Sequence, residues 1–428
     1  MDVFMELLRK LLQAGLQLLM NPFYYAGILF ILLQYRKQIQ FERKLFHIKL
    51  HSLLGETWRT LLWGWAAGFG ASLVLALVGV SLSGDAVFII WGLSILMIFF
   101  RVRFLCLAYS VGVLGILHVI FSFVPGASEW QGVGPVLKLI KETDIPSLLV
   151  IVALLHVIEG VLVRFEGARM ASPQYYEWKR GRIIGGYRLQ GFWPVPLFLI
   201  VPMQGGSVDS LPWSTLFGGE AMLAGWGMIA FPAMIGFSSL TVSRLARDKA
   251  HWNSNMLVLY GLILLLAAVA AHVWSPFTIA AAVLGIALHE GILWYGRWKE
   301  SNGSPIFVHS TKGLTVLAVL PGSAAEELGV QAGETIHKVN GFKIRSKADL
   351  HHAMQLNSAF CKLEVLNLQG EVRFLQRAIF SGEHHQLGII LAPDQQTMHY
   401  VETKQSHMFA YLRGKLSGLL TNDSGKPM

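Results

Sequence analysis

Long apolar segments, separated by short polar loops, occupy the chain from its start to about residue 296. A helix that crosses a membrane needs about 20 mostly apolar residues, and most of these segments have that length. Only 14% of the residues are charged, whereas a globular domain has roughly 25%. The sequence therefore predicts a polytopic α-helical membrane bundle in residues 1–300. The expected spans are 16–35, 58–80, 85–100, 104–124, 146–165, 217–239, 256–274 and 276–296.

A further apolar segment, FWPVPLFLIVP at 192–202, contains three prolines. Because proline removes a backbone N–H and breaks helices, this segment is interpreted as a distorted span or as a re-entrant segment packed among its neighbours. The bundle is thus expected to have about eight to nine spans. The side on which the N-terminus lies stays open, because 16–35 is either a span, a hairpin or an interfacial helix.

The formal net charge of +9 is distributed unevenly between the loops. Basic residues crowd alternate loops, whereas the opposite set of loops holds only Lys138 and Lys141. Lysine and arginine collect in cytoplasmic loops, so the pattern places the C-terminal region in the cytoplasm and requires 192–202 to cross the membrane. Membrane topology therefore explains the positive charge, and no nucleic-acid partner is expected.

The composition changes near residue 300, and residues 301–395 have the character of a small globular domain. The segment GLTVLAVLPGSAAEELGVQAGETIHKVNGFKIRSKADLHHAMQ resembles a PDZ domain of the bacterial type. Ser323 and Ser346 stand where the N-caps of two helices are expected, and Asn340-Gly341 is a strong hairpin turn. The resemblance implies a small α+β PDZ domain that follows the membrane bundle on its cytoplasmic side.

The PDZ resemblance also implies a groove that accepts an extended peptide by strand addition. QLGIILAP at 386–393 is similar to the Leu-Gly-Ile strand that some permuted bacterial PDZ domains place last. Leu387, Gly388 and Ile389 are therefore the expected peptide-docking edge, with His352 or His351 on the helix wall. An ordinary closing strand with exposed helix histidines is the alternative, because a short apolar strand is ambiguous from sequence.

The last segment, 396–428, is mostly polar. Phe409, Leu412, Leu416 and Leu419 recur near helical spacing, which is compatible with an amphipathic helix that binds a membrane surface or a partner. A frayed polar tail is the alternative.

Two expected spans carry a histidine and a glutamate at helix depth: His156 with Glu159, and His289 with Glu290. An intramembrane zinc protease would need His-Glu-x-x-His, in which two imidazoles one turn apart hold the metal, and neither stretch has the second histidine. Polar groups inside membranes commonly join helices, although ionisable ones are often functional. Structural pairing is therefore expected, and a metal or proton site is the alternative.

The two cysteines are too few to form a disulfide framework. Cys106 lies in an apolar run and Cys361 in the globular part, so both are interpreted as reduced, structural thiols. No catalytic residue, metal site or cofactor is expected.

The order of the segments along the chain is distinctive. NPFYYAGILFILLQYRKQIQFERKLFHIKL precedes the polytopic core, which is followed by GGYRLQGFWPVPLFL and by one PDZ-like domain. This order resembles the MinJ-like cell division topological determinants of rod-shaped Gram-positive bacteria. The resemblance implies a non-enzymatic adaptor of the cell membrane, enriched at the septum and poles, that links a DivIVA-like scaffold to MinD and through it to the septum inhibitor MinC. It leaves room for other divisome partners and for a homo-oligomer.

The alternative function is a PDZ-gated intramembrane enzyme or transporter. Its site would consist of His156, Glu159, His289 and Glu290. The adaptor is favoured, because a motif without its full ligand set is a weak signal.

Overall fold

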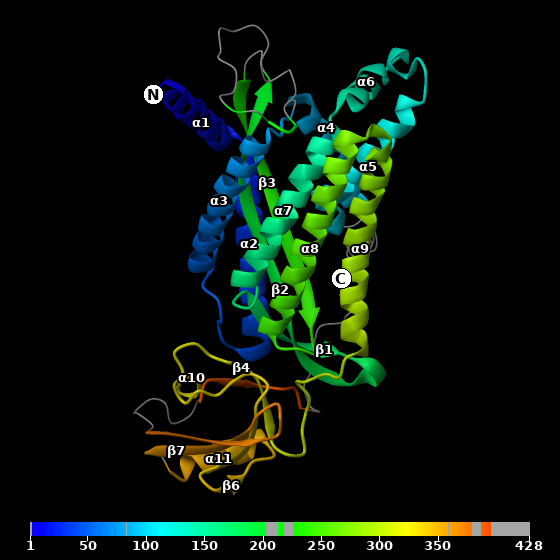
Figure 1. Ribbon diagram of the computed structural model, residues 1–428. Coiled ribbons are helices and arrows are strands. Elements are labelled where there is room, and N and C mark those ends of the chain that lie inside the picture. Colours follow the sequence, from blue (N-terminus) through cyan, green and yellow to red (C-terminus); the bar gives the residue numbers. More distant parts are fainter. Residues whose placement is uncertain are drawn as a thin grey trace, which may run out of the picture.

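The computed structural model describes residues 2–82, 84–100, 102–202, 213, 215–217, 226–357, 359–378 and 387–394. An elongated body of helices, with one long β-hairpin running through it, carries a smaller sheet domain at one end (Figure 1). The segment 396–428, for which the sequence allows either an amphipathic helix or a frayed tail, lies outside the described residues.

Within the described part of the chain, four helices are long and apolar enough to cross a membrane. The bent pair α1–α2, with 60° between its two helices, adds a fifth if it forms one span. The prediction of an apolar helical protein is confirmed, but this number is lower than the eight to nine spans predicted. The four helices are α3 (Leu53–Val78), α7 (Ile145–Glu166), α8 (Ala246–Val273) and α9 (Thr278–Asn302), the last preceded by the 3₁₀ turn η5 (Ser275–Phe277).

The bend between α1 (Asp2–Met20) and α2 (Pro22–Phe46) has a local cause. Asn21 has an extended backbone, and its side-chain oxygen accepts the N–H of Phe23 at 3.0 Å. Pro22 has no N–H with which to continue α1, but proline fits the first turn of a helix. The expected span 16–35 therefore contains the end of one helix and the start of another.

The helices α4 and α5 have 17 and 16 residues, fewer than the about 20 of a typical span. Cys106, directly before α5, contacts His156 and His289 near the middle of α7 and α9. The connection between α4 and α5 therefore lies inside the body, whereas the sequence predicts two full spans there. In this region α4 is Gly84–Phe100, η1 is Val102–Leu105, α5 is Leu107–Ser122 and α6 is Gly134–Glu142.

A three-stranded antiparallel sheet lies among the helices (Figure 1). Its central strand β2 (Ile183–Pro202) pairs with β1 (Ala171–Glu177) and, over most of its length, with β3 (Trp226–Thr241). The prediction of a spanning helix at 217–239 is wrong, because residues 226–239 belong to β3, and 192–202 is part of a strand. Apolar content alone does not distinguish a buried strand from a buried helix.

Prolines reduce the number of unpaired backbone N–H groups on the edge of β2 that faces α3. The N–H of Phe198 donates to Ser72 Oγ in α3 at 2.8 Å, so every second residue of β2 directs its backbone groups toward α3 and away from β3. Pro194 and Pro196 occupy two of these positions and have no N–H to leave unsatisfied. Inside a membrane, where water cannot satisfy backbone groups, this lowers the cost of an exposed strand edge.

Helix α3 approaches this strand through glycines. A Cβ at Gly64 would lie 2.2 Å from the carbonyl oxygen of Pro194, and one at Gly68 would lie 2.3 Å from that of Pro196. No larger side chain fits at either position without moving the backbone. The sequence predicts close helix packing at these glycines, and the structure shows that the partner is a strand.

The C-terminal domain contains a six-stranded sheet of order β8-β7-β5-β4-β9, with β6 paired to β5. Ser323 caps α10, Ser346 caps α11, and Asn340-Gly341 forms a positive-φ turn between β5 and β6, all as predicted. The elements are β4 (Leu314–Val319), α10 (Ala324–Glu327), β5 (Thr335–Val339), β6 (Phe342–Lys343), α11 (Lys347–Gln355), β7 (Phe360–Leu366), β8 (Val372–Ala378) and β9 (Ile389–Leu391).

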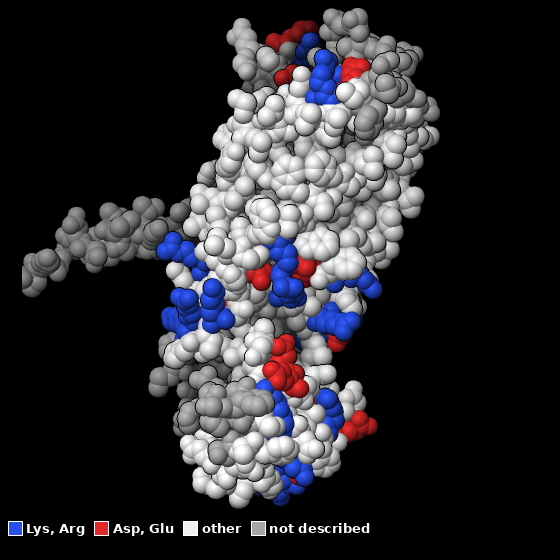
Figure 2. Space-filling model, turned by 90° about the vertical axis from the view of Figure 1, so that its left-hand side faces the viewer, with Lys and Arg blue, Asp and Glu red and all other residues white. Residues whose placement is uncertain are grey.

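Basic side chains gather where the body meets this sheet domain. Figure 2 shows Lys and Arg clustered on the lower part of the body, whereas the surface above them is almost free of charged side chains up to the far end. A wide uncharged surface bounded by basic residues is typical of a protein in a membrane.

Candidate functional site

Two of the expected peptide-docking residues anchor β9 inside the sheet domain. The side chain of Leu387 is buried in the core, and its carbonyl oxygen accepts the N–H of Ala325 at 2.9 Å. Gly388 has a φ of 76°, and a Cβ there would lie 2.2 Å from the Cβ of Ser323. Only glycine tolerates both this positive φ and this close approach. Leu387 and Gly388 therefore fix the position of β9.

Ile389 is the expected docking residue whose backbone faces outward. Gly388 accepts the N–H of Leu320 at 2.8 Å and so points toward β4, and the alternation of an antiparallel ladder turns the next residue away. Because β9 ends the strand order of the described sheet, Ile389 presents its N–H and C=O at a sheet edge. His351 and His352 are both exposed on α11.

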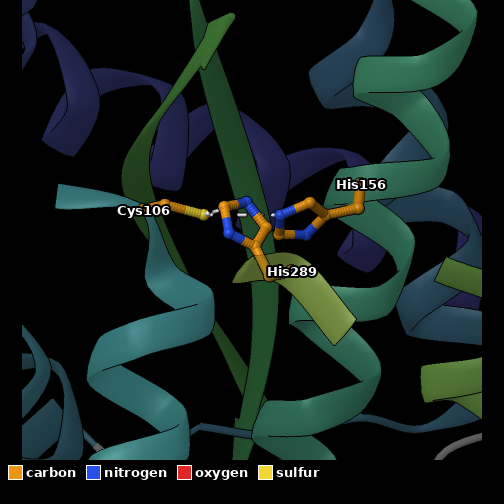
Figure 3. A group of neighbouring side chains, drawn as sticks. All are labelled: Cys106, His156 and His289. Carbon is orange, nitrogen blue, oxygen red and sulfur yellow. Dashed lines mark hydrogen bonds between the residues drawn. The ribbon is translucent and has the colours of Figure 1, made fainter. Parts of the chain in front are cut away.

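A second cluster lies inside the helical body, where Cys106, His156 and His289 point toward one another (Figure 3). Cys106 is the N-cap of α5, and the two histidines project from α7 and α9. The Cys106 Sγ atom lies 3.3 Å from His156 Nε2 and 3.8 Å from His289 Nε2. Three separate helices therefore bring one sulfur and two imidazole nitrogens to a single point.

Hydrogen bonds assign the tautomers of both histidines. His156 Nδ1 lies 2.8 Å from the carbonyl oxygen of Val152, which can only accept, so this nitrogen carries the proton. His289 Nδ1 lies 3.0 Å from the Tyr109 hydroxyl, which itself donates to Glu290 at 2.6 Å. The hydroxyl has one hydrogen, so His289 Nδ1 must donate to it. Both Nε2 atoms thus carry lone pairs that face Cys106.

The four ionisable residues predicted from sequence divide into two groups. His156 and His289 meet, with ring centroids 5.3 Å apart. Glu290 reaches the cluster through the Tyr109 hydroxyl, and it pairs with Arg103 at 3.1 Å. Glu159 is 8% exposed, and within the described residues it makes no hydrogen bond or ion pair.

Cys106 is the member of the cluster that sequence reasoning missed. One sequence feature could have pointed to Cys106. It lies at a break between two apolar segments, shortly after Arg101 and Arg103. A polar break inside an apolar region predicts a turn but does not predict which distant helices surround it.

The chain is similar to curated cell-division proteins. It is 29% identical over 397 residues to the cell division topological determinant MinJ of Bacillus subtilis strain 168, an overlap that covers 90% of this chain and 96% of that protein. It is 26% identical over 277 residues to the probable MinJ proteins of Lacticaseibacillus paracasei and Lacticaseibacillus casei strain BD-II, covering 60% of this chain and 68% of each. No known family profile and no solved structure matches the chain.

The names of these relatives describe determinants of cell-division topology and not enzymes. An overlap of 90% of the chain must include parts of both the helical body and the sheet domain. The family resemblance inferred from the sequence is therefore confirmed, and the chain is MinJ-like.

Proposed function

We propose that this chain is a membrane adaptor in division-site selection, which links a polar and septal DivIVA-like scaffold to the MinC/MinD system of septum inhibition. The similarity to MinJ over 90% of the chain carries the proposal. The adaptor acts through protein–protein contacts, and its apolar helices anchor it in the cell membrane as a multi-pass protein.

The C-terminal sheet domain is proposed to be a PDZ domain on the cytoplasmic side, covering residues 301–395. The basic side chains at its junction with the body support this orientation (Figure 2), because basic residues collect on the cytoplasmic side of membranes. The strand order and the two capped helices support the domain type.

An extended peptide of a partner is proposed to pair with β9 at Ile389, because the outward carbonyl oxygen of Leu391, two residues further on, already accepts the Tyr175 hydroxyl of the body. The outward backbone of Ile389 supports this mode, since strand addition uses unpaired N–H and C=O groups at a sheet edge. Leu387 and Gly388 position the strand, and His352 on α11 provides the opposite wall.

Localisation in dividing cells tests the proposed function. A fluorescent fusion of the full chain, expressed in a rod-shaped Gram-positive cell without its own homologue, is expected at the septum and poles. The enrichment should disappear when the DivIVA-like scaffold is removed. A uniform membrane signal in cells that contain the scaffold would contradict the proposal.

A proline substitution tests the docking edge. Ile389→Pro removes the outward N–H and is expected to abolish two-hybrid binding of a MinD-like or DivIVA-like partner without affecting membrane insertion. Val372→Pro is the matched control, because it lies at the first residue of the opposite edge strand β8, where proline is tolerated. If partner binding survives both Ile389→Pro and deletion of 305–428, the sheet domain is not the docking module.

The second candidate function is a PDZ-gated intramembrane enzyme or transporter, and the contact of His156 with His289 favours it. As a proton pathway it would use Glu159 and Glu290 as well. Proton uptake into vesicles that contain the purified chain would support this candidate if Glu159→Gln abolished the uptake. Equal uptake by vesicles with and without the chain would exclude proton transport.

A further inference from the structure

We propose that Cys106, His156 and His289 form a binding site for a zinc-class divalent ion inside the helical body. The site joins α5, α7 and α9 at a point near the middle of the two long helices (Figure 3). It does not depend on the adaptor function.

The three side chains of the cluster have fewer donor hydrogens than acceptor lone pairs where they meet. Both Nε2 atoms are unprotonated, because each neutral imidazole has one N–H and each Nδ1 uses it elsewhere. The two lone pairs face Cys106 Sγ, which has a single, weakly donating hydrogen. One nitrogen is therefore left without a donor in a partly buried place, which is unfavourable. A cation that accepts both lone pairs removes this deficit.

The spacing of the donor atoms suits one ion. Zinc binds sulfur at about 2.3 Å and histidine nitrogen at about 2.0–2.1 Å, so tetrahedral coordination separates two such donors by about 3.5 Å. The observed sulfur-to-nitrogen distances are 3.3 and 3.8 Å, and all three donor atoms lie within 4.8 Å of one another. Small side-chain rotations therefore suffice, and a fourth position stays available.

The local charges suit a divalent ion. Metal binding deprotonates the Cys106 thiol, which adds one negative charge. Glu159 lies about one helical turn from His156 on α7, is 8% exposed and has no hydrogen bond or ion pair in the described part of the chain. An isolated carboxylate is costly inside a membrane. The thiolate balances one of the two positive charges, and Glu159 is an acidic residue of α7 that would balance the second when it is ionised.

The ligand atoms, and the hydrogen bonds that orient the two histidines, favour one class of metal ion. Thiolate and imidazole favour zinc-class ions, whereas Mg²⁺ and Ca²⁺ prefer oxygen ligands. Metal-binding histidines usually donate their other N–H to a carbonyl or a carboxylate, which fixes the ring. Val152 does this for His156, and Tyr109 with Glu290 does it for His289.

Cobalt titration of the full-length chain tests the site. The protein is purified in detergent under reducing conditions, stripped with a chelator, and titrated with Co²⁺ alone. We expect one Co²⁺ per chain with a thiolate-to-cobalt charge-transfer band, and displacement of Co²⁺ by an equimolar amount of Zn²⁺.

Variants assign the band to its ligands. Cys106→Ser should remove the charge-transfer band, and His156→Asn or His289→Asn should weaken Co²⁺ binding at least about tenfold. Tyr109→Phe keeps all three donors but removes the hydroxyl that holds His289, so a loss of about 10–100-fold is expected. The controls are Cys361→Ser in β7 and His118→Asn in α5, which should keep both the band and the affinity. Thermal unfolding without metal shows whether each variant is folded.

Three outcomes overturn the proposal. They are a folded wild-type chain that binds neither Co²⁺ nor Zn²⁺ stoichiometrically, a band that survives Cys106→Ser, and a band that depends on Cys361. Localisation of the metal-binding variants is a separate readout. Normal septal enrichment of Cys106→Ser would leave the adaptor function intact, whereas failure of the adaptor proposal would leave the cobalt result unchanged.

Discussion

Glu300 joins three elements at the basic end of the body. Its carboxylate accepts hydrogen bonds from Lys249 Nζ and Ser243 Oγ, each at 2.9 Å, and from the N–H of Val242 at 3.1 Å. Lys249 is only 2% exposed, so Glu300→Gln leaves a buried ammonium without its counter-charge. We expect the free energy of unfolding in detergent to fall by about 3–5 kcal/mol.

An exposed ion pair provides the control for Glu300. Lys138 and Glu142 lie 3.8 Å apart with both side chains largely exposed, so Glu142→Gln should change stability by about 0–1 kcal/mol. If both substitutions lowered the free energy of unfolding equally, burial of the Lys249–Glu300 pair would not increase its contribution to stability.

His51, between α2 and α3, makes stability depend on pH. Burial lowers its pKa, but the hydrogen bond to Glu42 at 2.6 Å and the charge of Glu42 raise the pKa more, so the net shift is upward. A raised folded-state pKa stabilises the fold below the unfolded value of 6.5, and this contribution is lost as pH rises through the folded-state pKa. His51→Gln should therefore lower Tm more at about pH 6 than at about pH 9. The same loss at both pH values would exclude a role for the imidazolium charge.

At the scale of elements, the contact between α3 and β2 depends on the absence of a side chain. Gly68→Val places atoms against the carbonyl of Pro196, whereas Gly70 has nothing within 4 Å of an added Cβ. Both substitutions have the same intrinsic effect on the helix, so their difference measures the packing. We expect Gly68→Val to be less stable than Gly70→Val by about 1–3 kcal/mol, from thermal or denaturant unfolding in detergent. Equal stabilities would mean that α3 can move away from the strand without loss.

At the scale of the molecule, two tyrosines hold the sheet domain on the body. Tyr175 of β1 donates to the carbonyl oxygen of Leu391 at 2.9 Å, and Tyr187 of β2 donates to that of Leu317. The N–H of Gly185 donates to the carbonyl oxygen of Phe307 at 2.8 Å. The core is continuous across this junction, so the domain is docked against the hairpin and is not a free appendage.

Removing one hydroxyl should loosen this junction. Tyr175→Phe leaves the Leu391 carbonyl without its donor, at a cost of about 1–3 kcal/mol, and hydrogen exchange in β9 should become faster. Tyr25→Phe is the control, because its hydroxyl donates to the Leu19 carbonyl on an exposed part of the body. Unchanged exchange in Tyr175→Phe would show that other contacts hold β9 on the body.

The sequence by itself determined the features that depend on neighbouring residues. The caps at Ser323 and Ser346, the turn at Asn340-Gly341 and the apolar length of α7 and α8 were all predictable, because each rests on interactions within a few residues or on local composition. The order of these segments was also sufficient for the MinJ-like family resemblance.

Only the tertiary structure decided that 192–202 pairs with β3 as a strand, and that Cys106 meets His156 and His289. A strand needs a partner to satisfy its backbone, so the identity of 192–202 depends on residues 226–241 and on α3. The two histidines of the cluster, His156 and His289, are separated from Cys106 by 50 and 183 positions. Their meeting follows from how α5, α7 and α9 pack, and no pattern of a few residues contains that information.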